Sequence, residues 1–224
     1  IKPDLRVLTK ILEIGIPSVL MISIGSVMTY AMNKILIVFT PTAVAVFGVY
    51  FKLQSFVFMP IFGINNAMVP ILAYNYGAGH KDRIHKTIKL SVMYAVIIMF
   101  LGLATFQLIP NKLLLLFNAS DDMLSLGVYA LRIVSLSYIF AGFCIIISSV
   151  CQAFGHGLYS LYISIGRQVV VLIPAAFILS KIGGLKLVWF SFPMAEIVAV
   201  LLSIFFLKKS LSSLKFNDTA EKTA

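Results

Sequence analysis

Residues 187–207 read LVWFSFPMAEIVAVLLSIFFL, an apolar stretch that contains a single charged side chain, Glu196. A helix of about 20 such residues crosses the hydrocarbon core of a bilayer, which is roughly 30 Å thick. Apolar runs of this length form helices, because the strands of a membrane barrel alternate apolar and polar residues. The stretch therefore predicts a transmembrane helix.

The same pattern recurs along the whole chain. The 224 residues are 60% hydrophobic and 12% charged, with a mean hydropathy of +1.02, which excludes an ordinary soluble domain. We expect an all-α, polytopic membrane protein: a six-helix bundle over residues 1–209 and a polar, disordered cytoplasmic tail over 210–224. The predicted spans are 14–39, 43–76, 88–109, 123–154, 158–179 and 187–207. The breaks fall at Thr40-Pro41-Thr42, Gly77-Ala78-Gly79, Pro110-Asn111, Gly155-His156-Gly157 and Gly183-Gly184.

Basic residues are distributed unequally between the two ends of these spans. One side carries Lys2, Arg6, Lys10, Lys81, Arg83, Lys86, Lys89, Lys208, Lys209, Lys215 and Lys222; the other carries Lys34, Lys112, Lys181 and Lys186, with Asp121 and Asp122. The positive-inside rule then predicts a cell-membrane protein with both ends of this segment cytoplasmic. The net charge of +10 reflects these short clusters, and no aromatic-interleaved groove indicates nucleic acid. The opening Ile1 is not an initiator Met, so we expect part of a longer polypeptide.

Four charges lie within the apolar stretches: Lys52, Arg132, Arg167 and Glu196. A charge in hydrocarbon costs about 2.5–3.5 kcal/mol on insertion scales and marks a pathway, a partner or a misplaced boundary. Arg167 and Glu196 lie at similar depth in the last two spans, and we predict an ion pair between them. Its role is either structural or the coupling of a proton or cation. Lys52 and Arg132 lie in overlong spans, where each lines an outward-facing vestibule or anchors at the interface.

Polar residues follow one face of the first span, from Ser18 through Ser26 and Thr29 to Asn33, and one face of the fourth. Such stripes pack helices together or line a cavity. A site for many drugs would be apolar and aromatic with a few polar groups. The substrate-cavity candidates are Tyr30, Asn33, Lys52, Gln54, Met59, Arg132, Tyr138 and Gln152.

The second span contains Pro60, with Gly63 one turn later. Proline removes a backbone hydrogen bond, so we expect a kink near the middle of the membrane. The kink belongs either to a mobile transporter helix or to a static bend.

Catalytic and metal-binding patterns are not found in the sequence. Cys144 and Cys151 lie about 10 Å apart on one predicted helix and are expected to be unpaired packing residues. No nucleophile and base can be placed together, and no metal-ligand cluster occurs. We expect neither an enzyme nor a metal site.

Several motifs, taken in order, resemble one repeat of the multidrug and toxic compound extrusion (MATE) family, and are most similar to the C-terminal half of bacterial multidrug exporters. They are Gly15-Ile16-Pro17, Phe58-Met59-Pro60-Ile61-Phe62-Gly63, Tyr76-Gly77-Ala78-Gly79, Leu116-Phe117-Asn118-Ala119-Ser120-Asp121, Tyr129-Ala130-Leu131-Arg132-Ile133, Gln152-Ala153-Phe154-Gly155, the run from Ser164 to Pro174, and Phe192-Pro193-Met194-Ala195-Glu196.

The resemblance implies a twelve-helix transporter of two six-helix lobes, with this chain as the second lobe. Such a transporter exports amphipathic, often cationic compounds in exchange for H⁺ or Na⁺ by alternating access. Its partners would be the lipid bilayer, small-molecule substrates and an N-terminal lobe of the same polypeptide. Some members carry a coupling Glu in the stretch that corresponds to Leu20 to Ser26, which has no carboxylate here, so the coupling-ion site is expected in the N-terminal lobe. Two alternatives are a lipid-linked saccharide flippase and a non-transporting membrane assembly module.

Overall fold

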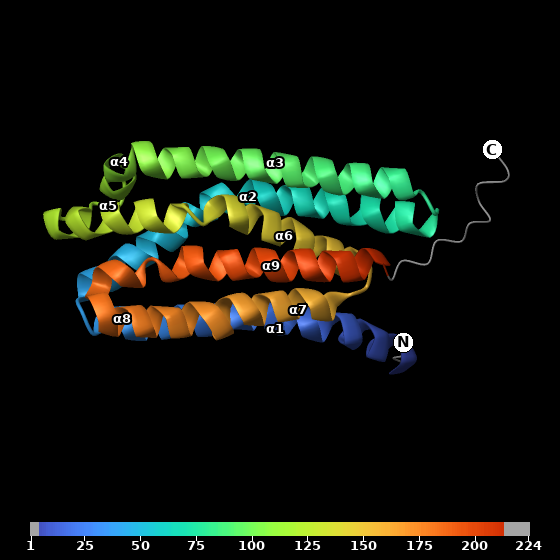
Figure 1. The fold of residues 1–224 in the computed structure, drawn as a ribbon, viewed down its shortest axis with the longest axis horizontal. Coiled ribbons are helices and arrows are strands. Elements are labelled where there is room, and N and C mark those ends of the chain that lie inside the picture. Colours follow the sequence, from blue (N-terminus) through green and yellow to red (C-terminus); the bar gives the residue numbers. More distant parts are fainter. Residues whose placement is uncertain (1–4, 213–224) are drawn as a thin grey trace.

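The computed structural model describes residues 5–212, which form helices throughout, with no strand in that range. The elements are α1 (Leu5–Ile37), α2 (Pro41–Gly77), α3 (Lys81–Leu108), α4 (Pro110–Leu115), α5 (Asp121–Ser135), α6 (Tyr138–Ala153), α7 (Gly157–Ile165), the π-helix η1 (Gly166–Leu172), α8 (Ile173–Val188) and α9 (Ser191–Ser212). Figure 1 shows them as a bundle of long helices running along one axis.

Between residues 5 and 212, five helical runs are long and apolar enough to cross a membrane, namely α1, α2, α3, the continuous run of α7, η1 and α8, and α9. A sixth span results if α5 and α6 are counted together. The predicted number of spans is therefore reached only with this bent pair. The sequence predicted one continuous helix over 123–154, whereas the structure breaks it at Leu136 and Ser137 with a bend of 48°. The short helix α4 was also not predicted.

The helix boundaries follow local sequence signals. Thr40 caps α2, because its side chain accepts a hydrogen bond from the Thr42 backbone N–H at 3.2 Å, and Pro41 occupies the first turn. Ser120 caps α5 in the same way through Met123. At Gly183 and Gly184 the backbone leaves helical geometry within α8, with a φ of +63° at Gly184. The breaks predicted at Thr40-Pro41-Thr42 and Gly183-Gly184 are confirmed, whereas the cap at Ser120 was not predicted.

The predicted tail begins later than expected, since α9 continues through Ser210 to Ser212. The rest of that tail, residues 213–224, lies outside the described residues.

The helices form two groups joined through α6 and α9. The first group is α2 with α3, and α3 also packs on α6; the second is α1 with α7, and η1 packs on α9. Figure 1 shows α6 and α9 lying between α3 on one side and α7 and α8 on the other. This arrangement leaves the inner faces of α1, α2, α6 and α9 turned towards one another.

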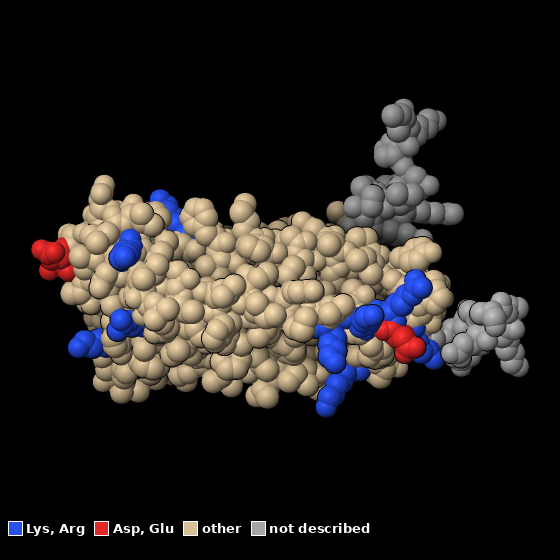
Figure 2. Space-filling model, turned by 90° about the horizontal axis from the view of Figure 1, so that it is seen from above, with Lys and Arg blue, Asp and Glu red and all other residues tan. Residues whose placement is uncertain are grey.

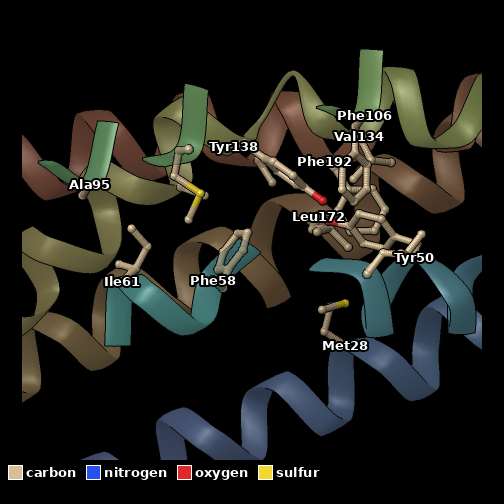
Figure 3. Close-up of a cluster of buried hydrophobic side chains, with 14 of the residues drawn as sticks. Met28, Tyr50, Phe58, Ile61, Ala95, Phe106, Val134, Tyr138, Leu172 and Phe192 are labelled. Carbon is tan, nitrogen blue, oxygen red and sulfur yellow. The ribbon is translucent and has the colours of Figure 1, made fainter. Parts of the chain in front are cut away.

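A cluster of buried side chains joins the helices where the two groups meet. Figure 3 shows Tyr138 of α6 between Phe58 of α2 and Phe106 of α3. The ring centroids of these two pairs are 5.5 and 5.2 Å apart, in edge-to-face arrangements typical of aromatic packing. Gly102 allows α3 to approach α2, because any Cβ there would collide with Val57. The core therefore fixes α2, α3 and α6 relative to each other.

Both described chain ends lie at the same end of the bundle, where α1 begins and α9 ends (Figure 1). Figure 2 shows most lysine and arginine side chains gathered at that end, with acidic side chains among them, while the opposite end has fewer basic side chains beside an acidic cluster. The described basic residues that belong to the first end are Lys81, Arg83, Lys86, Lys89, Lys208 and Lys209, all exposed. The fold thus keeps the charge asymmetry that the sequence predicts.

Candidate functional site

A cavity of about 1000 Å³ opens between α1, α2, α6, α7, η1 and α9. This volume is at the upper end of the range for small-molecule sites. Its walls combine aromatic rings, amides, hydroxyls and one ion pair, so polar groups are present but few compared with apolar surface.

The wall formed by α1 is the polar stripe seen in the sequence. Ser26, Thr29, Tyr30 and Asn33 line the cavity. Thr29 donates its hydroxyl hydrogen bond to the Gly25 carbonyl at 2.9 Å, which satisfies it within the helix. Of the two alternatives for this stripe, cavity wall and helix packing, these residues support the first.

The wall formed by α2 carries most of the aromatic surface. Tyr50, Gln54, Phe58 and Phe62 recur every four residues and all line the cavity. Residues at this spacing lie on one face of a helix. Asn65 continues the stripe, and its Oδ1 atom, like Oε1 of Gln54, is buried with no hydrogen-bond partner. The wall therefore offers ring faces together with unused amide acceptors.

The wall formed by α6 and α7 is hydroxylic. Ser148, Ser149 and Gln152 of α6 line the cavity, as does Ser160 of α7. Ser160 donates a hydrogen bond to the Ser148 carbonyl at 2.6 Å and so joins the two helices. The Gln152 amide lies 3.7 Å from the Met21 sulfur of α1. The polar stripe of the fourth predicted span thus both packs helices and lines the cavity.

Arg167 and Glu196 form the ion pair that their matched depth predicts. Nη1 of Arg167 lies 3.0 Å from Oε1 of Glu196, and both residues line the cavity. Arg167 belongs to the π-helix η1, whose extra residue per turn changes the direction of the side chains that follow. Gly166 also favours close packing, because a Cβ there would lie 2.6 Å from Cδ1 of Leu202 on α9 and would displace the end of that side chain. The wide turn and the small residue together bring η1 against α9.

Half of the substrate-cavity candidates line the cavity and half do not. Tyr30, Asn33, Gln54 and Gln152 line it; Lys52, Met59, Arg132 and Tyr138 do not. The prediction is therefore wrong for the last four residues.

Met59 follows Phe58 by one residue and so points to another face of α2, where 71% of its surface is exposed. Tyr138 is fully buried behind the wall, between Phe58 and Phe106. Met59 and Tyr138 are both apolar enough to face either lipid or the protein interior. Only the packing of the helices shows that neither side chain faces the cavity.

Lys52 and Arg132 are exposed and lie outside the cavity. Nζ of Lys52 is 5.9 Å from the Phe117 ring centroid, beyond α4, and the Arg132 carbonyl accepts a hydrogen bond from Gln107 at 2.8 Å. Of the two alternatives for these charges, interfacial anchoring fits this placement, and lining the cavity does not.

Pro60 and Gly63 do not line the cavity and are exposed. Hydrogen-bonded helix continues through both, from Pro41 to Gly77. Figure 1 shows α2 changing direction along its length. The two alternatives for this bend, a mobile transporter helix and a static bend, both remain predictions.

Sequence reasoning missed Asn65, Asn66 and Gln168, which also line the cavity. The adjacent amides Asn65 and Asn66, inside an apolar span, were a usable signal, since amides are rarely placed in lipid. Gln168 lies beside Arg167 and donates to the Ser164 hydroxyl at 3.0 Å. Between residues 5 and 212, no group of three or more His, Cys, Asp or Glu side chains could hold a metal ion.

Comparison with known proteins identifies relatives over nearly the whole chain. Multidrug export protein MepA of Staphylococcus haemolyticus (strain JCSC1435) is 28% identical over 204 residues, which cover 91% of this chain and 45% of that protein. Multidrug export protein MepA of Staphylococcus aureus (strain MSSA476) is 28% identical over 223 residues, covering 98% and 48%. The chain therefore spans about half the length of the curated relatives it matches.

Solved structures share the fold. A MOP superfamily transporter from Pyrococcus furiosus superposes with a TM-score of 0.88 at 23% identity, covering 95% of this chain and 48% of that one. An inward-facing multidrug resistance MATE family transporter has a TM-score of 0.85 at 23% identity, covering 100% and 51%. The MatE family model matches residues 17–178, most of the chain. The chain therefore belongs to the MatE family.

Proposed function

We propose that this chain is one lobe of a secondary active exporter that moves amphipathic, cationic compounds across the cell membrane in exchange for H⁺ or Na⁺. The cavity supports this proposal most directly. Its aromatic faces from α2 suit flat apolar cations, and its unpartnered amide oxygens suit donors on a ligand. Relatives named multidrug export proteins point to the same class of substrate.

The partner in this proposal is an N-terminal six-helix lobe of the same polypeptide. The chain matches about half of each relative, and the polar stripe on α1 together with the aromatic stripe on α2 borders an open cavity. Transport by alternating access would then rock one lobe against the other about this cavity. In this proposal the start of α1 and the end of α9 face the cytoplasm, and the basic residues gathered at that end of the bundle support this orientation.

The saccharide-flippase alternative is less well supported. A site for an anionic lipid-linked substrate needs several free cations, whereas Arg167 is the one Lys or Arg lining the described cavity and it is already paired. Lys52 and Arg132, the other two basic residues within the apolar stretches, lie outside the cavity.

The proposal is tested with the full-length transporter in proteoliposomes loaded with a fluorescent cation such as ethidium. An imposed pH gradient or Na⁺ gradient should drive efflux, and the gradient that works identifies the coupling ion. Efflux that is the same with and without both gradients would rule out ion-coupled export. Transport of a labelled lipid-linked saccharide without ethidium efflux would favour the flippase.

A further inference from the structure

Glu196 is the only carboxylate that lines the cavity among the described residues. Its two oxygen atoms have different surroundings. Oε1 accepts the hydrogen bond from Arg167, while Oε2 is buried and has no hydrogen-bond partner. The residue as a whole is only 9% exposed. A buried carboxylate oxygen without a partner is unfavourable in free energy, because it has lost its hydrogen bonds to water and forms none with the protein.

A proton is a better partner for the unpaired Oε2 atom of Glu196 than a metal cation is, because a proton needs only one oxygen atom. A hard cation collects several oxygen ligands at once. The other unpartnered buried oxygen on α9 is that of Ser203, which lies seven residues on, about 10 Å along the helix axis. A single cation cannot contact both atoms at that separation. A proton needs one oxygen only and converts Oε2 into a hydroxyl.

We propose that Glu196 is a proton-binding residue of this lobe and that Arg167 converts its protonation into a change of charge in the cavity. The inference rests on the proposed exchange function. A proton delivered from water binds Oε2 and turns the carboxylate into a carboxylic acid. When Glu196 is ionised, the pair carries no net charge. When it is protonated, Arg167 carries an uncompensated positive charge, and a quarter of its side chain is exposed beside the cavity. A cationic compound is then repelled, which is the sign of coupling that antiport requires.

The charged and titratable neighbours of Glu196 are few. Arg167 of η1 forms the ion pair with it, and Tyr50 of α2 and Cys144 of α6 line the same cavity. The lysines of α8 and the acidic pair and arginine of α5 are exposed. The remaining ionisable residues on helices packed against α9 are Tyr129, Tyr138, Cys151, Tyr159 and Tyr162, none of which is an acidic or basic side chain. Among residues 5–212, Arg167 is therefore the one charge beside Glu196 that protonation leaves uncompensated.

Infrared difference spectroscopy between acidic and alkaline pH tests the proposal directly, because a protonated carboxylic acid has a carbonyl stretch distinct from that of a carboxylate. The sample is the full-length transporter in liposomes. We expect a protonated-acid band that disappears in Glu196→Gln and persists in Asp122→Asn, whose carboxylate is exposed at the start of α5. Adding Na⁺ at constant pH should leave the band unchanged. A band that Na⁺ removes would overturn the proposal in favour of a cation site.

Glu196→Gln leaves Arg167 without its partner and could prevent folding. The double variant Arg167→Gln/Glu196→Gln removes both charges and should lack the same band. An unchanged band in either folded variant would overturn the proposal. Binding of tetraphenylphosphonium gives a second measurement: acidification should weaken it by about tenfold in the wild type and less in the double variant. Equal weakening in both would also overturn it.

These results are separable from the efflux test. Gradient-driven efflux without a Glu196-dependent band would leave the proposed function intact and overturn the proton site. A Glu196-dependent band without gradient-driven efflux would support the proton site and overturn the proposed function.

Discussion

Gly102 of α3 faces Val57 of α2 so closely that a Cβ on Gly102 would overlap the Val57 side chain. Val57 is β-branched and has few alternative rotamers, so it cannot easily move aside. The approach of α2 to α3, on which the α2 wall of the cavity depends, therefore requires glycine at this position.

Gly102→Ala should lower the stability of the full-length protein by about 1–3 kcal/mol, the usual cost of overpacking. The midpoint of thermal unfolding in detergent measures the effect. Gly48→Ala in α2 is the matched control, because its position is exposed and no atom lies within 4 Å of the added Cβ. That control should gain up to about 1 kcal/mol from higher helix propensity. Similar shifts in both variants would contradict close packing at Gly102.

Arg167→Met should destabilise the protein by about 3–5 kcal/mol, because it leaves the Glu196 carboxylate buried without its counter-charge. The loss should be larger at alkaline pH, where Glu196 stays ionised, than at acidic pH, where a proton neutralises it. Arg167→Met/Glu196→Met should recover most of the stability. Thermal unfolding of the three proteins at two pH values measures the coupling, and additive losses would mean that the pair contributes nothing.

Phe62→Ala and Met59→Ala form a matched pair on α2. Both side chains are large and more than half exposed, but only Phe62 lines the cavity. Loss of a ring face should weaken binding of an aromatic cation by about two- to thirtyfold in Phe62→Ala, while Met59→Ala should bind as the wild type does. Fluorescence titration with ethidium measures both affinities. Equal weakening would place the substrate elsewhere.

Lys86→Cys and Lys112→Cys test the membrane orientation, because the two residues lie at opposite ends of the bundle and both are exposed. In intact cells an impermeant maleimide should label Lys112→Cys and spare Lys86→Cys until the membrane is opened. Native Cys144 and Cys151 are buried and should give little background. The opposite labelling pattern would reverse the proposed topology.

Several features of the fold could be predicted because they depend on one helix at a time. Hydrophobic length located the spans, and glycine and proline located most of the breaks. Arg167 and Glu196 could be paired because they lie at similar depth in adjacent spans, and an unpaired charge at that depth in the membrane would be costly in free energy. The bend between α5 and α6 carried no such signal, since both parts are apolar and neither glycine nor proline lies at Leu136 and Ser137.

The sequence by itself determined that the chain spans a membrane, where most of its spans are separated, and which charges need partners. Only the tertiary structure decided which side of each helix meets the cavity. In a soluble protein, polarity separates the inside from the outside, but lipid is as apolar as a protein core. Phe62 and Met59, three residues apart on one apolar helix, therefore look alike in sequence, and only the packing of α2 against its neighbours assigns one to the cavity and the other to its exterior.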